Sequence, residues 1–214
     1  MISAIVFDLD GTLIDSKEDI IGSANFALKT IGKAPVTVSE GIKHVGRGAH
    51  YLLEKLLPGE SPAVIQKCHS LFLDYYAQNP VLKTKVYKGV FEVLSFYEKL
   101  PMFVVTNKNE NVANLILQKL LISKYFKQVV GGDTYDQLKP NPYAIEKIIE
   151  NYAVKRPQML MVGDTDIDIQ FGINANIKTC RFESNFGAMS DCRLAKENIK
   201  IKHFLELKSV INSL

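Results

Sequence analysis

Short apolar runs alternate with longer amphipathic segments along most of the chain. The runs are rich in β-branched residues and apolar throughout, which is typical of strands buried on both faces of a sheet. Strong runs cover residues 3–7, 102–106 and 158–164, and weaker ones cover 127–133 and 177–182. Apolar residues recur at helical spacing in 89–100, 110–121, 141–153 and 165–176. This alternation predicts a Rossmann-like parallel sheet covered by helices, which is an α/β fold.

The region from about Asp15 to Gln78 departs from this alternation. It contains no strong strand pattern, and its helical patterns cover 16–32, 46–57 and 62–78. We therefore predict a helical module at 15–81, inserted into an α/β core made of 1–14 and 82–214. Segment 79–89, which contains a proline, three lysines and a closing glycine, fits a return connection. The last part of the chain, 187–214, predicts a short strand and a closing helix.

Composition is that of an ordinary globular chain and excludes several classes of protein. The 214 residues are 47% hydrophobic and 23% charged, and 26 basic against 23 acidic residues give a net charge of +3. This balance predicts no nucleic-acid partner, and no apolar stretch reaches spanning length, so we expect no membrane partner. The odd set of Cys68, Cys180 and Cys192 lacks a C-x-x-C pair and indicates neither a disulfide framework nor a zinc site. We expect a cytoplasmic protein.

Polar side chains follow the predicted strands at the points where they end. These residues are Asp8 and Asp10, Thr106 and Asn107, Asp164, Asp166 and Asp168, with Lys139 just before the helix at 141–153. In a parallel α/β sheet the carboxyl ends of the strands share one edge, so these groups can meet there. Carboxylates suit Mg²⁺, and hydroxyl, amide and ammonium donors suit phosphate oxygens. Each residue alone has an ordinary structural explanation, but the combination predicts phosphoryl transfer.

Asp8 and Asp10 stand two residues apart, at the end of a strand pattern. Alternate side chains of a strand point to the same side, so the two carboxylates would project together and repel. A hard cation, or a proton held by one of them, relieves that repulsion, and both are useful in catalysis. An Asp-Gly turn with solvated aspartates is the structural alternative for this stretch taken by itself.

Four segments in this order resemble the motifs of the haloacid dehalogenase superfamily of phosphohydrolases. They are "FDLDGTLIDS", "VVTNK", "LKPNP" and "VGDTDIDI", and they extend over nearly the whole α/β part. The helical module is similar to the α-helical cap of that superfamily. Within the cap, "HVGRGAHYLLEKLL", together with "TNK" and "GGD", resembles the phosphoglycolate phosphatase branch. The resemblance implies a phosphatase with a HAD-like core, which hydrolyses a small phosphomonoester.

The resemblance also implies roles for the acidic residues. Asp8 would be the nucleophile that forms an aspartyl-phosphate. Asp10 would protonate the leaving oxygen and then act as the base for the hydrolytic water. Mg²⁺ would be held by the carboxylates of Asp8 and Asp164 and by the backbone carbonyl of Asp10, with Asp168 in support.

Four further residues would bind the substrate. Thr106, the backbone beside Asn107, and Lys139 would hold the phosphoryl oxygens, and Lys139 would also restrain Asp8. Arg47 is the candidate cap residue for a second anionic group, although a solvated arginine near a helix start explains it equally well. The expected partner is a small phosphorylated metabolite, and the expected assembly is a monomer or a homodimer.

Other functions remain open at this point. The same residues would serve a phosphomutase of the β-phosphoglucomutase type, a pyrophosphatase or a nucleotidase. A phospho-Asp receiver module also gathers carboxylates, a threonine and a lysine around Mg²⁺. However, a receiver has no helical insertion of about sixty residues and needs no second aspartate two places after the nucleophile.

Overall fold

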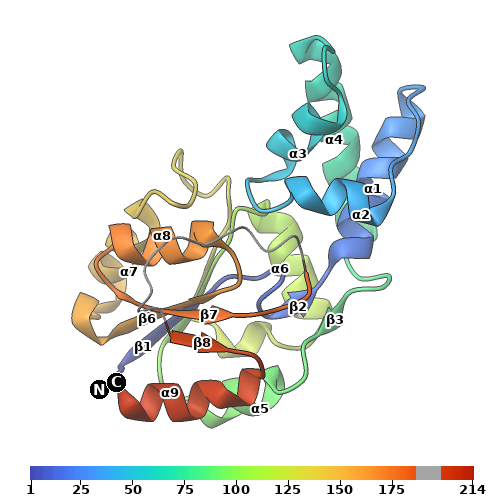
Figure 1. The fold of residues 1–214 in the computed structure, drawn as a ribbon. Coiled ribbons are helices and arrows are strands. Elements are labelled where there is room, and N and C mark those ends of the chain that lie inside the picture. The colour runs from blue at the N-terminus through green and yellow to red at the C-terminus, as the bar shows by residue number, and fades with distance from the viewer. Residues whose placement is uncertain (187–198) are drawn as a thin grey trace.

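The computed structural model describes residues 1–186 and 199–214, so Cys192 and the start of the predicted C-terminal part lie outside the described residues. Its main sheet contains six parallel strands in the order β5-β4-β1-β6-β7-β8 (Figure 1). Their bounds are β1 Ala4–Phe7, β4 Met102–Val105, β5 Gln128–Val130, β6 Met159–Gly163, β7 Lys178–Phe182 and β8 Ile199–Ile201. The predicted α/β fold is confirmed, including both weaker strand patterns.

Strand β1 lies inside the sheet, paired with β4 on one side and β6 on the other. All four of its residues are buried. Ile5 and Phe7 belong to the apolar cluster on one face, and Ala4 and Val6 belong to the cluster on the opposite face. This burial on both faces explains why β1 is apolar at every position instead of alternating.

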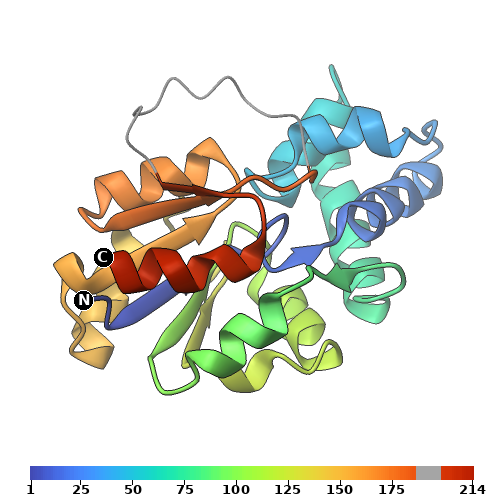
Figure 2. The ribbon, with the colours of Figure 1, turned by 60° about the horizontal axis from the view of Figure 1, so that its bottom comes forward.

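Helices cover both faces of the sheet (Figure 2). On one face, Ile145 and Ile148 of α7 pack with Phe171 of α8, while α5, α6 and α9 contribute to the cluster on the other face. The bounds are α5 Val90–Phe96, α6 Glu110–Lys119, α7 Tyr143–Tyr152, α8 Asp166–Asn174 and α9 Leu207–Ser213. Short 3₁₀ helices are η2 Ser123–Tyr125, η3 Arg156–Gln158 and η4 Phe204–Glu206. The layers therefore follow the predicted alternation.

The helices between β2 and β3, here called the cap helices, form a separate group beside the sheet (Figure 1). They are α1 Lys17–Thr30, α2 Val38–Gly41, α3 Ala49–Leu56 and α4 Pro62–Gln78, with the 3₁₀ helix η1 Ile42–His44. Helices α1 and α4 pack against each other, as the stacked rings of Phe26 and Tyr75 show, with centroids 4.1 Å apart. The domain limits at residues 14 and 82 stay a prediction.

The chain segments that lead into and out of the cap helices pair as two short antiparallel strands, which were not predicted from the sequence. β2 Ile14–Asp15 pairs with β3 Lys85–Val86. Beside it, the buried carboxylate of Asp19 on α1 accepts hydrogen bonds from the backbone N–H groups of Leu82, Lys83 and Thr84 at 2.8–3.0 Å. The Thr84 hydroxyl also donates to it, at 2.6 Å. These contacts fix the outgoing chain to the returning chain.

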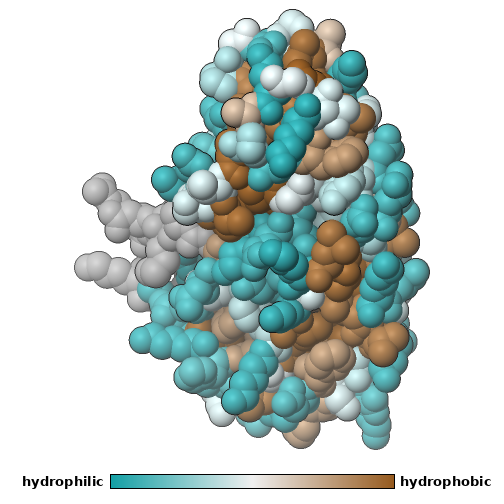
Figure 3. Space-filling model, turned by 90° about the vertical axis from the view of Figure 1, so that its right-hand side faces the viewer, coloured by the Kyte–Doolittle hydropathy of each residue, from teal (hydrophilic) through white to brown (hydrophobic). Residues whose placement is uncertain are grey.

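Three further features concern the surface, the chain ends and the lengths of the helices. On the face shown in Figure 3 apolar side chains gather in patches between polar ones, and the exposed apolar residues of the described chain include Phe91, Phe96 and Leu205. Both ends of the chain lie together, where the amino group of Met1 is 3.4 Å from the carbonyl oxygen of Leu214. Within the described ranges, no helix has the length and hydrophobicity needed to cross a bilayer.

Candidate active site

Three neighbouring strands deliver polar residues to one edge of the sheet. Asp8 follows β1, Thr106 follows β4 and Asp164 follows β6, and β1 pairs with both of the other strands. The backbone N–H groups of Asp8 and Thr106 continue the sheet pattern, at 2.9 Å from the carbonyls of Val162 and Val130. The side chains of Asp8 and Thr106 are therefore set by the register of the sheet. This convergence at the carboxyl ends of the strands is the one predicted from the sequence.

Lys139 joins Asp8 to Asp168. Its Nζ lies 2.6 Å from Oδ1 of Asp8 and 2.7 Å from Oδ1 of Asp168, and all three side chains are at least nine-tenths buried. The second oxygen of Asp168 accepts from the backbone N–H and the hydroxyl of Thr165, which caps α8. Asp168 thus uses both oxygens to hold the lysine and the start of α8.

Burial and like charges perturb this cluster. Burial raises the pKa of Asp8 from an ordinary 3.8 to about 7, although the Lys139 ammonium opposes the rise. Burial, followed by the negative charges of Asp168 and Asp8, also raises the pKa of Asp164 well above its ordinary value. Burial lowers the pKa of Lys139, but the carboxylates of Asp168 and Asp8 outweigh that effect, so its pKa is raised. One ammonium does not balance three carboxylates, and the site has an excess of negative charge.

The donor set fits a hard divalent cation. Asp8, Asp164 and Asp168 each offer a carboxylate oxygen, and these oxygens lie within 4.8 Å of one another. Carboxylate oxygens are the ligands that Mg²⁺ and Ca²⁺ take in proteins. A cation at this point would also offset the burial and the carboxylate repulsion that raise the pKa values of Asp8 and Asp164. The cluster is therefore able to bind a metal.

Two glycines make room for these carboxylates. Gly11 has φ of +87°, and a Cβ at this position would lie 2.2 Å from Oδ2 of Asp164. A Cβ on Gly163 would lie 2.2 Å from Cβ of Asp168. The Thr12 hydroxyl, in the same turn as Gly11, donates to Oδ1 of Asp164 at 3.0 Å. The Asp-Gly-Thr turn thus permits and directs the approach of Asp164.

Asp10 lies at the same edge but has different partners. Its carboxylate accepts from the Ser16 hydroxyl and lies 2.9 Å from Nζ of Lys108. Lys108 also donates to the hydroxyl of Tyr76 on α4, at 3.2 Å. Asp8 therefore faces Lys139 and the possible metal ligands, while Asp10 faces the cap helices. The two aspartates that the sequence placed side by side occupy different environments.

Asn107 connects the site to the lysine segment and to the cap helices. Its Oδ1 accepts from the backbone N–H of Lys139 at 2.9 Å, and its Nδ2 donates to the carbonyls of Lys139 and Gly46 at 3.1 and 3.0 Å. The side chain is thus occupied in holding the backbone of Lys139 in place. This leaves the backbone of Asn107, rather than its amide, for contact with a ligand.

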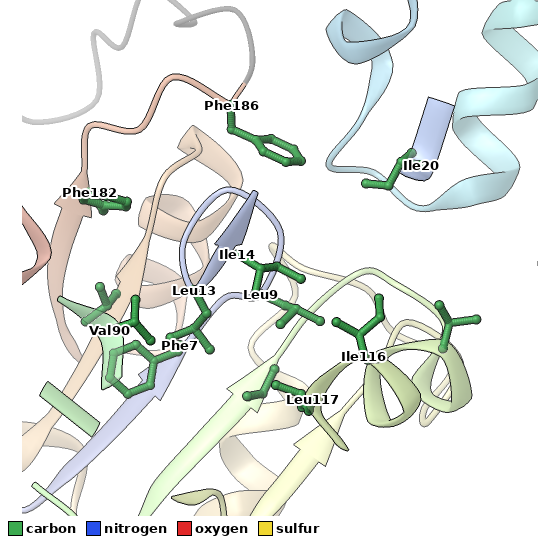
Figure 4. Close-up of a cluster of buried hydrophobic side chains, with 14 of the residues drawn as sticks. Phe7, Leu9, Leu13, Ile14, Ile20, Val90, Ile116, Leu117, Phe182 and Phe186 are labelled. Carbon is green, nitrogen blue, oxygen red and sulfur yellow. The ribbon is translucent and has the colours of Figure 1, made fainter. Parts of the chain in front are cut away.

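These residues line a cavity of about 140 Å³ between the sheet edge and the cap helices. Asp8, Asp10, Thr106, Lys139 and Asp164 form its polar side. Much of the remaining wall is apolar. Figure 4 shows Ile20 on α1 and Phe186 after β7 pointing toward one another across this region, above the apolar cluster that includes Phe7 and Leu9. The cavity suits a small ligand with one highly charged end.

Residues 5–182 match the family described as haloacid dehalogenase-like hydrolase. The chain belongs to this family. It is 35% identical over 188 residues to a phosphoglycolate phosphatase of Photobacterium profundum, a match that covers 84% of this chain and 81% of that protein. It is 37% identical over 177 residues to a phosphoglycolate phosphatase of Aquifex aeolicus, with 82% of each chain covered. Family and relatives together indicate that this hydrolase is a phosphatase enzyme.

Solved structures agree with the fold of this haloacid dehalogenase-like hydrolase. A predicted phosphoglycolate phosphatase from Haemophilus somnus superposes with a TM-score of 0.89 at 23% identity, covering 98% of this chain and 97% of that one. A predicted phosphatase from Clostridium acetobutylicum gives 0.87 at 24% identity, with all of both chains covered. At this level of identity the likeness supports the fold.

Arg47 differs from the other predicted residues of this hydrolase. It is exposed, its guanidinium lies 5.4 Å from the centre of the Tyr51 ring, and it is not among the residues that line the cavity. Lys43, on η1, does line the cavity. A substrate contact by Arg47 stays a prediction, and it would require the guanidinium to move.

Several polar partners in the site were not predicted from the sequence. Ser16, Tyr76 and Lys108 surround Asp10, and Thr12 contacts Asp164. Lys108 stands inside the quoted segment "VVTNK", so its place after a strand end was a usable signal. Tyr76 gave no signal, because its approach depends on how α4 packs against the core.

Proposed function

We propose that this phosphatase hydrolyses a small phosphomonoester, of the kind represented by phosphoglycolate, through an aspartyl-phosphate on Asp8 and with Mg²⁺ as cofactor. The observation that carries the proposal is the cluster of the buried Asp8 and Asp168, both paired with Lys139, and the half-buried Asp164, all lining one cavity with Thr106. Such an arrangement supplies a nucleophile, cation ligands and phosphate donors at one point.

Asp8 would attack the phosphorus, and the bond from phosphorus to the ester oxygen would break as the new bond to Oδ forms. Lys139 contacts an oxygen of Asp8 at 2.6 Å, so it can orient the attacking carboxylate and meet the oxygens of the phosphoryl group. The Thr106 hydroxyl and the backbone N–H of Asn107, which line the same cavity, would donate to these oxygens. These donors stabilise charge without rearrangement during the reaction.

Asp10 would transfer the protons. It would donate a proton to the departing ester oxygen and then take one from the water that hydrolyses the acyl phosphate, which releases inorganic phosphate and restores Asp8. Its carboxylate contacts Lys108 and Ser16, whereas the carboxylate of Asp8 contacts Lys139. This separation supports a division of roles between the two aspartates.

Mg²⁺ would be held by the carboxylates of Asp8 and Asp164 and by the backbone carbonyl of Asp10. When bound, it supplies positive charge that offsets the repulsion between the carboxylates and a phosphate dianion. Both oxygens of Asp168 accept hydrogen bonds from Lys139 and Thr165, which favours a supporting role for Asp168 over direct ligation.

The substrate class rests on the relatives and on the cavity. Both relatives described above are phosphoglycolate phosphatases, and a cavity of about 140 Å³ fits a small phosphorylated metabolite. We further propose that the protein acts in the cytoplasm as a monomer or homodimer, with neither nucleic acid nor membrane as partner. The free thiols of the buried Cys68 and Cys180 suit a reducing compartment.

A Mg²⁺-dependent panel of phosphomonoesters tests the proposal. We expect phosphate release from phosphoglycolate and other small esters, and its loss when the metal is chelated. Conversion of a hexose 1-phosphate to its isomer would instead indicate the phosphomutase alternative, and preference for pyrophosphate or nucleotides would indicate the pyrophosphatase or nucleotidase alternative. A long-lived phosphoprotein without turnover would indicate a receiver-like function. No turnover of any monoester by folded protein would contradict the proposal.

A further inference from the structure

Lys108 is a buried cation in the cavity that the reaction proposed above does not use. Its Nζ lies 2.9 Å from Oδ2 of Asp10 and 3.2 Å from the hydroxyl of Tyr76, and 4.5 Å from the centre of the Tyr76 ring. Only 7% of its side chain is exposed. A buried ammonium is costly unless it is paired, so these contacts hold it in one place.

Lys108 faces the part of the cavity where the leaving group would lie. Its backbone N–H is 3.3 Å from the Thr106 hydroxyl oxygen, while its ammonium reaches Tyr76 on a cap helix. It therefore extends from the phosphate end toward the cap helices. In the proposed reaction Asp10 protonates the ester oxygen. Lys108, 2.9 Å from Asp10, therefore lies beside the leaving-group atoms bonded to this oxygen.

The Lys108 ammonium and the Tyr76 hydroxyl each keep a hydrogen-bond donor for a ligand. The ammonium has three N–H donors, and two of them are used by Asp10 and Tyr76. The Tyr76 hydroxyl accepts from Lys108, so its own hydrogen remains free to donate to a ligand. Two donors, one of them charged, match the two oxygens of a carboxylate.

The other cations at the cavity are placed differently. Lys139 is held by Asp8 and Asp168, and Arg181 lies 2.8 Å from Asp166. Lys43 lines the cavity but is exposed. The apolar part of the cavity wall includes Ile20, Val45, Leu52, Phe72 and Phe186. Among the lining residues described, Lys108 is the cation that pairs with Asp10.

We propose that Lys108 and Tyr76 bind a carboxylate carried by the leaving group, so that the enzyme selects phosphomonoesters of short hydroxy acids over neutral or cationic esters of the same size. This inference rests on the proposed function and adds the residues that set its specificity. Because Lys43 is exposed and Arg181 is paired with Asp166, the selectivity depends on Lys108 and Tyr76.

The test compares kcat/KM for three esters of similar size: phosphoglycolate, 2-hydroxyethyl phosphate and 2-aminoethyl phosphate. Wild type should prefer phosphoglycolate over the neutral ester by about tenfold or more, because the carboxylate gains a charge-assisted contact with Lys108. It should reject 2-aminoethyl phosphate, because the ammonium of that ester is repelled by Lys108. Lys108→Met should reduce that preference to about twofold or less. The change should be mainly in KM, since the carboxylate is bound throughout the reaction.

Two further variants control for general damage. Tyr76→Phe removes the hydroxyl with little change in shape and should reduce the preference by about threefold or more. Lys67→Met removes a charge from an exposed position of the same cap helix and should leave the preference unchanged. Melting curves establish that each variant folds, and Tyr76→Phe decides the question if Lys108→Met does not fold.

The same comparison without turnover separates this inference from the proposed function. Phosphoglycolate binding is measured by calorimetry with Mg²⁺ in the Asp8→Asn protein and in Asp8→Asn combined with Tyr76→Phe or Lys108→Met. Weaker binding in the combined variants supports the Lys108 and Tyr76 site even if no ester is turned over, an outcome that would contradict the proposed reaction. Unchanged binding, or an unchanged ester preference in Lys108→Met, would overturn the inference.

Discussion

Replacing Asp19 by asparagine should loosen the connection between the cap helices and the core. The Asp19 carboxylate accepts from three backbone N–H groups, of Leu82, Lys83 and Thr84, and from the Thr84 hydroxyl. Oδ2 of Asp19 lies within 3.0 Å of all four donors, whereas Oδ1 meets the Lys83 N–H alone, so an asparagine with its oxygen in the place of Oδ2 keeps these donors but loses the negative charge. Four hydrogen bonds that change from a charged to a neutral acceptor, each weakened by about 0.75 kcal/mol, predict a decrease of about 3 kcal/mol in the free energy of unfolding.

Urea unfolding followed by circular dichroism measures this difference, and Glu18→Gln is the matched control. Glu18 precedes Asp19 and pairs with Lys83 at 2.7 Å, but its side chain is 51% exposed. Removing that charge should cost less than about 0.5 kcal/mol. Equal effects of the two substitutions would refute the reasoning, because burial and backbone partners would then not matter.

The pH dependence gives a second check on Asp19. Burial tends to raise the pKa of Asp19, but the hydrogen bonds from Thr84, Lys83 and Leu82 outweigh it and lower the pKa below its ordinary value of 3.8. A lowered folded-state pKa contributes stability that is fully present above about pH 4 and is lost as the pH falls through the folded-state value. The difference between wild type and Asp19→Asn should therefore be constant from pH 7 to 5 and shrink below about pH 4. A difference that grows on acidification would contradict this account.

Two other substitutions test the carboxylate cluster. Gly11 has φ of +87°, and Gly11→Ala would place a Cβ 2.2 Å from an oxygen of Asp164. The affinity for Mn²⁺, used as a probe and measured by calorimetry, should therefore fall at least about tenfold. Unchanged affinity would remove Asp164 from the metal site. Lys139→Met leaves Asp8 and Asp168 buried without their cation. We expect kcat to fall by about 10²- to 10³-fold and the free energy of unfolding to fall by about 3–5 kcal/mol. A kcat within tenfold of wild type would contradict the role of Lys139.

The sequence predicted those parts of the site that follow from a parallel sheet. Asp8, Thr106 and Asp164 come directly after strands that are neighbours in the sheet, so their convergence needs only the strand order and the direction of the chain. The pattern of apolar residues also located both weaker strands, β5 and β7. Local pattern and global fold agree at these positions, which is why a reading of the chain alone could find them.

The parts that depend on how the cap helices pack were not predictable in the same way. Tyr76 meets Lys108 across 32 positions of sequence, through the orientation of α4 on the core. In the turn around η1, Lys43 lines the cavity while Arg47 lies over Tyr51, and helical periodicity does not specify the course of such a turn.

Short elements were missed for a different reason. β2 and β3 have two residues each, which is too few for a strand period to show. They are stabilised by pairing with each other and by the neighbouring Asp19 contacts, both of which join distant parts of the chain.

The most direct test of the central claim is to identify the residue that carries the phosphoryl group during turnover. The Asp10→Asn variant should accumulate the acyl phosphate from p-nitrophenyl phosphate, because this leaving group needs no proton while hydrolysis lacks its base. Borohydride reduction of the quenched protein, followed by peptide mass spectrometry, should show homoserine at position 8, and none in a parallel Asp8→Asn sample. Reduction at another aspartate, or full turnover without modification of Asp8, would contradict the account.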